Sequence, residues 1–217
     1  MTPFQQQIEQ DLAWREAEMA SLKMLLASAP TGSDRQRALL RACSAMLYAH
    51  YEGFCKFCWT LMLDTIAAED HVRSDLVEPL AKRSMIPVFR TFRGNTSDDA
   101  LWRFADSDFR NSLSQVARFP DEIETESNLW PKVSQKINNS VGLECPVLNT
   151  YEAELKQLVG RRNDIAHGEK LEIADIQRFQ KFEHAAVVVM HELALGVAEC
   201  LENRSYLRPS VDPAASI

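Results

Sequence analysis

The sequence predicts an all-α protein: an antiparallel helical bundle of two helical hairpins, with an irregular helical insertion in the middle crossover. The chain has only 7 glycines and 9 prolines among 217 residues, and it is rich in residues that favour helices. Apolar residues recur at helical spacing over long stretches near both ends of the chain. Between these stretches the spacing is interrupted by turn-forming residues, which predicts the insertion.

The first hairpin is predicted from two long stretches. Residues 4–27 carry an apolar stripe that ends at "SAPTGSD", which is typical of a helix followed by a turn. Ser33 or Asp34 is a suitable N-cap for a second helix over residues 35–69. The second half of that helix is apolar on nearly all sides, so we expect it at the centre of the core.

The insertion is predicted between about residues 70 and 142. Residues 71–85 are compatible with a helix bent at Pro79, and the rest mixes turn signals with short helical fragments. Long irregular connections in a compact domain are usually functional, so we expect substrate or partner specificity to lie here.

The second hairpin is predicted from helices over residues 147–167 and 172–206, followed by a flexible tail over 208–217. Both hairpins are expected to share one core, so residues 1–217 are interpreted as a single domain.

Charge and cysteine content limit the function and the compartment. The net charge of −7 argues against a protein that coats nucleic acid, although a local basic patch remains compatible with it. Five scattered cysteines and the absence of a signal peptide or a long apolar run indicate a soluble cytoplasmic protein without a membrane partner. Cys55 and Cys58 have the Cys-x-x-Cys spacing of a metal or redox site, but no second cysteine pair has zinc spacing. We therefore expect these thiols in the core, and we expect no metal and no cofactor.

The string "GRRNDIAHGE", residues 160–169, is the most informative motif. Asn163 and His167 are four residues apart and share a helix face, and the long side chain of Arg162 can reach the same place. Gly168 suits the position after a C-cap, which puts His167 in the last helical turn. The helix dipole there favours the imidazolium form and Arg162 opposes it. Such a histidine can act as a general base or acid.

The motif has a family resemblance. The order Arg-Asn-x-x-x-His at a helix end, followed by Gly168 and a further helix, resembles the catalytic signature of the HEPN superfamily of metal-independent ribonucleases. The segments "LYAHYEGFCKF" and "ESNLWPKVSQKINNSVGLE" are similar to those of one bacterial branch, the RiboL-PSP-HEPN-like group of toxins and antiphage defence proteins. The resemblance covers roughly residues 35–200.

The resemblance implies an endoribonuclease that uses the RNA 2′-hydroxyl as nucleophile and leaves a 2′,3′-cyclic phosphate. His167 would transfer protons, Arg162 would hold the scissile phosphate bidentately, and Asn163 would orient the phosphate or the imidazole. It also implies a homodimer with a composite active site, and an antitoxin or regulatory protein as a possible partner. An arginine near a helix C-terminus can also simply cap carbonyl groups.

Further candidates surround the motif. Arg161 is interpreted as a surface or phosphate-steering residue. Tyr48, His50 and Glu52 on the second helix are candidates for lining the cleft, with a purely structural role as the alternative. His184 and His191, seven residues apart on the last helix, are interpreted as core-edge or interface residues.

The string "PVFRTFRG" interleaves Phe89 and Phe92 with Arg90 and Arg93, a combination that can stack bases and bind phosphates. The alternative is a loop anchored by buried aromatic rings. For the whole chain, the alternative to a ribonuclease is a non-catalytic HEPN-like module that binds RNA or nucleotide or only dimerises.

Overall fold

A computed structural model describes residues 1–93, 96–120, 123–170 and 175–209. In these ranges all regular structure is helical, and extended segments pair only in two isolated bridges, Val72 with Val116 and Leu76 with Leu207. The predicted all-α fold is therefore confirmed.

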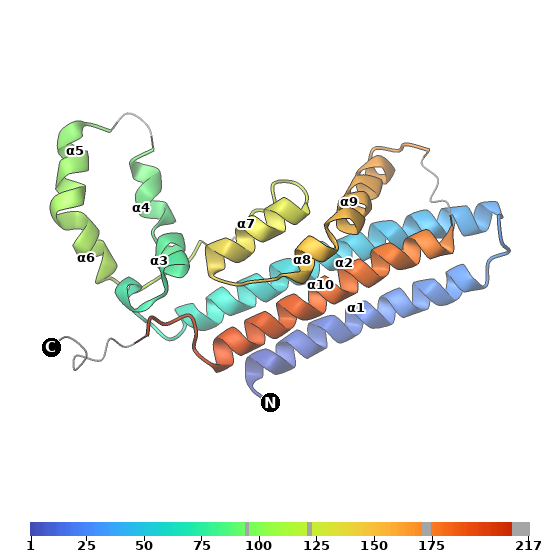
Figure 1. Cartoon of the computed structure of the whole chain (residues 1–217), viewed down its shortest axis with the longest axis horizontal. Helices are drawn as coiled ribbons and strands as arrows, with labels where there is room; N and C mark the ends of the chain where they lie inside the picture. The colour runs from blue at the N-terminus through green and yellow to red at the C-terminus, as the bar shows by residue number, and fades with distance from the viewer. Residues whose placement is uncertain (94–95, 121–122, 171–174, 210–217) are drawn as a thin grey trace.

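Three long helices lie side by side and form the bundle (Figure 1). They are α1 (Pro3–Ala27), α2 (Asp34–Ala67) and α10 (Ile176–Glu202), and α9 (Glu152–Ala166) packs on α2 and α10 at an inclination. The N-cap of α2 is Ser33, whose hydroxyl accepts a hydrogen bond from the Gln36 N–H at 3.1 Å. The two predicted hairpins are thus α1 with α2 and α9 with α10.

Helix α2 provides the centre of the core, as its apolar sequence predicts. All five cysteines of the chain are buried free thiols, including Cys55 and Cys58 on α2. Burial raises the pKa of both of these thiols, so they remain uncharged. The largest fully buried side chains of α2 are Tyr48, Tyr51, Phe54 and Trp59.

Helix α10 is long and apolar enough, by length and composition alone, to cross a membrane. In the structure it packs against α1, α2, α8 (Val147–Thr150) and α9. Its residues Phe179, Phe182 and Val189 are buried in the same core as those of α2. This packing accounts for its apolar sequence as that of a core helix.

Part of the predicted insertion projects from the bundle (Figure 1). We call residues 78–93 and 96–113 the arm. A 3₁₀ turn, η1 (Arg73–Asp75), precedes it. The elements of the arm are α3 (Glu78–Ser84), α4 (Ile86–Thr91), α5 (Asp98–Arg103), the π-helical turn η2 (Phe104–Asp108) and α6 (Phe109–Leu113).

Aromatic rings and one buried arginine hold the arm together. The ring centres of Phe92 and Phe104 are 4.4 Å apart, and those of Phe89 and Phe104 are 6.4 Å apart. At the base of the arm, Arg73 donates hydrogen bonds to the Ser84 hydroxyl and, through Nη1, to acceptors just after α6 and within it. Phe89 and Phe92, which are half-buried, therefore pack α4 against η2. The "PVFRTFRG" string is thus mostly helical and is not a loop with buried rings.

Helix α7 (Pro131–Val141) belongs to the packed core although it lies within the predicted insertion. The buried indole N–H of Trp59 donates a hydrogen bond to Asn138 Oδ1 at 2.8 Å. Helix α7 also contacts α3, α8 and α9. It therefore separates the arm from α9.

Two predicted helices differ from the structure. Residues 76 and 77 are extended and α3 begins only at Glu78, so Pro79 lies in a first turn, where proline is favourable, and does not bend a longer helix. The helix predicted over residues 147–167 is divided at Tyr151 into α8 and α9. Residues 172–174 of the predicted last helix, and residues 210–217 of the predicted tail, lie outside the described ranges.

Candidate functional site

Helix α9 ends in a turn that fixes the place of His167. His167 is the C-cap, and Gly168 follows it with a φ of 78°, a left-handed conformation that glycine adopts at little cost. The Gly168 N–H donates to the Ile165 carbonyl at 3.1 Å, and the Glu169 N–H donates to the Asp164 carbonyl at 2.9 Å. These two bonds define a Schellman motif, so the helix end predicted at Gly168 is confirmed.

The same turn is tied to α2 by a residue that the sequence did not indicate. Arg41 Nη1 donates a hydrogen bond to the Glu169 carbonyl at 2.8 Å. The imidazole of His167 is exposed and forms no hydrogen bond with the residues that the structure describes. It is therefore accessible to a substrate or to a second chain.

The guanidinium of Arg162 is held only by neutral groups. Its Nη1 donates to Asn128 Oδ1 at 2.9 Å and to Asn163 Oδ1 at 3.0 Å, and its central carbon lies 4.9 Å from the centre of the Tyr48 ring. Within the described ranges no carboxylate pairs with Arg162. The guanidinium is thus oriented by groups that carry no negative charge, which suits it to bind an anion.

Tyr48 supports this arrangement from inside the core. Its hydroxyl accepts a hydrogen bond from the Leu129 N–H at 2.9 Å and lies 3.4 Å from Asn128 Oδ1. Burial raises the pKa of the Tyr48 phenol far above its usual value, so the ring remains neutral beneath Arg162.

A strained turn presents Asn128 to Arg162. Glu126 and Ser127 have φ angles of 52° and 71°, which residues other than glycine rarely adopt. The turn is fastened to α2 because the Thr125 hydroxyl donates to the Glu52 carboxylate at 2.6 Å. Such strain persists only where surrounding contacts impose it, and it is concentrated at functional sites.

Arg162 borders a hollow of about 410 Å³ between α2 and α9. Lys56 contributes a second cation with no ion-pair partner in the described part of the chain. Glu52 contributes the one carboxylate, which already accepts the Thr125 hydrogen bond. The hollow can therefore hold a phosphate group. Its lining consists of Ala45, Tyr48, Ala49, Glu52, Gly53, Lys56, Arg162, Ile165 and Ala166.

The structure brings together some of the predicted site residues and not others. Arg162, Tyr48 and Glu52 line the hollow. Asn163 does not line it, but its Oδ1 accepts a hydrogen bond from Arg162 and so orients the guanidinium rather than an imidazole. His167 lies five residues beyond Arg162, which is about 7.5 Å along the helix axis, and does not line the hollow. Arg161 is half-exposed and does not line it either.

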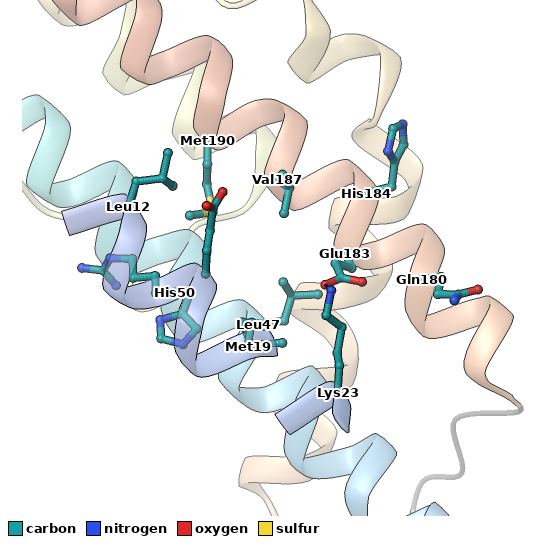
Figure 2. Close-up of a pocket in the computed structure, with 12 residues that line it drawn as sticks. Leu12, Met19, Lys23, Leu47, His50, Gln180, Glu183, His184, Val187 and Met190 are labelled. Carbon is teal, nitrogen blue, oxygen red and sulfur yellow. Dashed lines mark ion pairs between the residues drawn. The ribbon is translucent and has the colours of Figure 1, made fainter. Parts of the chain in front are cut away.

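His50 was predicted to line the cleft, but it does not face the hollow. Residues 48 and 50 point in nearly opposite directions, about 200° apart around the helix. His50 lies in a second cavity of about 380 Å³ between α1, α2 and α10 (Figure 2). Its Nε2 is 2.9 Å from the Glu18 carboxylate, and its ring meets that of Trp14 edge-on.

The other predicted candidates also lie elsewhere. Arg90 and Arg93 border a groove between the arm and α7. His184 forms a hydrogen bond with the Tyr151 hydroxyl at 3.0 Å, and His191 lies 3.0 Å from the Glu16 carboxylate. Both histidines are exposed at the edge of the bundle, where the sequence analysis placed them.

Two residues of the site, Asn128 and Lys56, were not predicted from the sequence. Lys56 follows Glu52 by one turn and Tyr48 by two, so a polar stripe on an otherwise apolar helix was the available signal. Asn128 lies in a turn without periodicity, and only its place in the string "ESNLW" marked it. In the described ranges no group of three His, Cys, Asp or Glu side chains could hold a metal ion.

Comparison with known proteins identifies the family. No curated protein and no solved structure matches the chain. A family model described as HEPN_MAE_28990-like HEPN matches residues 4–206, which include α1, α2, α9 and α10. Membership of the RiboL-PSP-HEPN-like branch stays a prediction from the resemblance. The fold, the Arg162-Asn163 pair at the end of α9 and the family match together show that the chain belongs to the HEPN superfamily, in the HEPN_MAE_28990-like family.

Proposed function

We propose that this protein is a metal-independent endoribonuclease. Membership of the HEPN superfamily supports a function connected with RNA. The observation that carries the proposal is the guanidinium of Arg162, which is fixed by Asn128, Asn163 and Tyr48 while its charge remains unpaired by any described carboxylate. An arginine with only a structural role would gain more from a carboxylate partner than from two amides.

The proposed reaction is an in-line transfer within the RNA. The 2′-oxygen forms a bond to phosphorus, the bond from phosphorus to the 5′-oxygen breaks, and the products are a 2′,3′-cyclic phosphate and a 5′-hydroxyl. Arg162 would stabilise the negative charge that grows on the phosphate oxygens, with Lys56 as a nearby second cation. His167 would take the 2′-hydroxyl proton or give a proton to the 5′-oxygen.

The reaction needs both a base and an acid, whereas one chain places one histidine at the end of α9. A second copy, related by a two-fold axis through this end, would add a second His167 and Arg162. The exposure of His167 is compatible with such a homodimer, which forms part of the proposal. A role as a toxin or antiphage effector, with a neutralising partner protein, stays a prediction from the family resemblance.

The test is cleavage of RNA by the purified protein in EDTA. We expect wild-type protein to leave 2′,3′-cyclic phosphate ends, and His167→Ala and Arg162→Ala to lose at least about 100-fold in rate. His191→Ala is the matched control, because His191 is also exposed but lies on α10 away from the motif. Cleavage that persists in His167→Ala would contradict the proposal.

The alternative is a HEPN module that binds RNA without cutting it. It is favoured by the net charge of −7 and by the distance along α9 between His167 and Arg162. A folded wild-type protein that binds RNA but leaves it intact, both as a monomer and as a dimer, would establish this alternative.

A further inference from the structure

A groove between the arm and α7 collects cations that the motif does not use. It consists of two adjoining hollows of about 300 and 630 Å³ that share Arg83, Arg93 and Ser140 in their walls. We call it the arm groove. Arg83 comes from α3, Arg90 from α4 and Arg93 from the residues just after α4.

The arm groove is positive although the protein is acidic. Two of its lysines are neutralised locally, since Lys136 pairs with Glu126 at 2.5 Å and Lys82 pairs with a glutamate one turn away on α3. This leaves the three arginines against one carboxylate, Glu124, that has no ion-pair partner in the described ranges. A concave surface with this excess attracts anions.

Arg83 gives independent support for a ligand. Its Nε is buried and has no hydrogen-bond partner among the described residues, and its one hydrogen bond is donated by Nη1 to the Ser140 hydroxyl at 3.0 Å. A guanidinium stays charged inside a protein, so an incompletely paired and partly buried one is unfavourable until an anion reaches it.

One segment connects the arm groove to the motif. Ile123, Glu124 and Glu126 line the groove. Two residues after Glu126, the side chain of Asn128 accepts the hydrogen bond from Arg162. Two residues of extended chain span at most about 7 Å, so the rim of the groove at Glu126 is close to the Arg162 contact. A flexible polyanion bound at Arg162 can continue over this turn into the groove.

We propose that the arm groove binds the phosphate backbone of single-stranded RNA, a few nucleotides away from the phosphate held by Arg162. This inference rests on the proposed function for the Arg162 site and extends the substrate beyond it. Phe92 packs on Phe104 and does not line the groove, whereas the Phe89 ring borders one of the two hollows while it also faces Phe104. The groove would contact the RNA backbone mainly through its arginines, which carries no base sequence information.

The test is RNA binding by the full chain, measured by fluorescence anisotropy with probes whose 2′-oxygens are methylated and cannot attack. One probe has about four nucleotides and the other about twelve, within the range that single-strand sites cover. We compare wild-type protein with the double variant Arg90→Gln/Arg93→Gln. The matched control is Arg103→Gln/Arg110→Gln, which removes two exposed arginines from the same arm outside the groove.

We expect the Arg90/Arg93 variant to bind the long probe more weakly, with a log–log salt slope reduced by about 1.4 for two lost phosphate contacts. Binding of the short probe, and all binding by the control variant, should stay at the wild-type level. Equal effects of both double variants, equal effects on both probes, or no binding of the long probe by wild type would overturn the inference.

The ribonuclease proposal is judged separately, by cleavage of unmodified RNA. If the Arg90/Arg93 effect is found while wild-type protein cuts nothing, the arm groove stands and the ribonuclease proposal fails. If wild-type protein cleaves RNA and the Arg90/Arg93 variant binds the long probe like wild type, the ribonuclease proposal stands and the arm-groove inference fails.

Discussion

The substitution Asn128→Asp separates a structural role of Arg162 from an anion-binding role. Aspartate has nearly the same shape as asparagine, and its carboxylate can accept the hydrogen bond that Arg162 Nη1 now donates to Asn128 Oδ1 at 2.9 Å. The substitution therefore keeps the contact and adds one negative charge beside the guanidinium. The folded state should be as stable as wild type or more stable, because charged hydrogen bonds are the stronger ones.

The expected loss of substrate binding follows from the geometry. A phosphate bound on the opposite edge of the guanidinium would lie about 7 Å from the new carboxylate, given hydrogen bonds of ordinary length on both sides. Repulsion between unit charges at about 7 Å is about 2.4 kcal/mol at an effective dielectric constant of about 20, and about 1.2 kcal/mol at about 40. Because Arg162 is half-exposed, the loss in kcat/KM should lie between about 7-fold and about 50-fold.

The assay is the initial rate of cleavage of a fluorogenic RNA in EDTA, together with the urea midpoint of each protein. Asn149→Asp is the matched control, since Asn149 is exposed on α8 and its substitution changes the net charge equally. If Asn128→Asp is folded and cleaves within about twofold of wild type, Arg162 does not bind the scissile phosphate and the electrostatic reasoning is refuted.

Two further predictions concern stability. Gly168→Ala should lower the free energy of unfolding by about 1 kcal/mol, because Gly168 has a positive φ. Gly160→Ala should raise the free energy of unfolding by about 0.5 to 1 kcal/mol, because Gly160 lies in mid-helix with free space around it. Equal urea midpoints for the two variants would contradict this. Burial lowers the pKa of His50, so stability should fall as pH drops below about 6.5, where the unfolded chain takes up a proton that the folded chain resists. His50→Gln should weaken this loss between pH about 6.5 and about 5, whereas His191→Gln should not, and parallel stability curves for all three proteins would exclude His50 as the cause.

The extent to which the sequence predicted the fold depends on periodicity. The ends of α1 and α2 and the turn at Gly168 carry apolar stripes or cap residues, and these predictions are confirmed. The assignment failed around Pro79, because proline is compatible both with a bend inside a helix and with the first turn of a new one. Only the extended backbone before Glu78 decides between these possibilities.

In the candidate site, only contacts between residues close in sequence could be predicted. Arg162 and Asn163 are adjacent in sequence, so their pairing could be expected, but their partner Asn128 lies 34 residues away. Tyr48 and His50 looked equivalent as candidates because both are polar aromatic residues near Glu52. Their rotation about the helix axis places one against Arg162 and the other against α1.

The pairing of charges explains how an acidic protein can still present an unpaired cation to an anionic ligand. Many exposed cations are neutralised by a neighbour, such as Lys23 by Glu183 and Arg118 by Asp70. Arg162, in contrast, is held by amides, which orient a guanidinium without cancelling its charge, at the expense of the stability that a carboxylate would add. A site of this kind exchanges stability for function. Asn128→Asp should therefore move the two in opposite directions, whereas a purely structural arginine would show a gain in stability and no loss of activity.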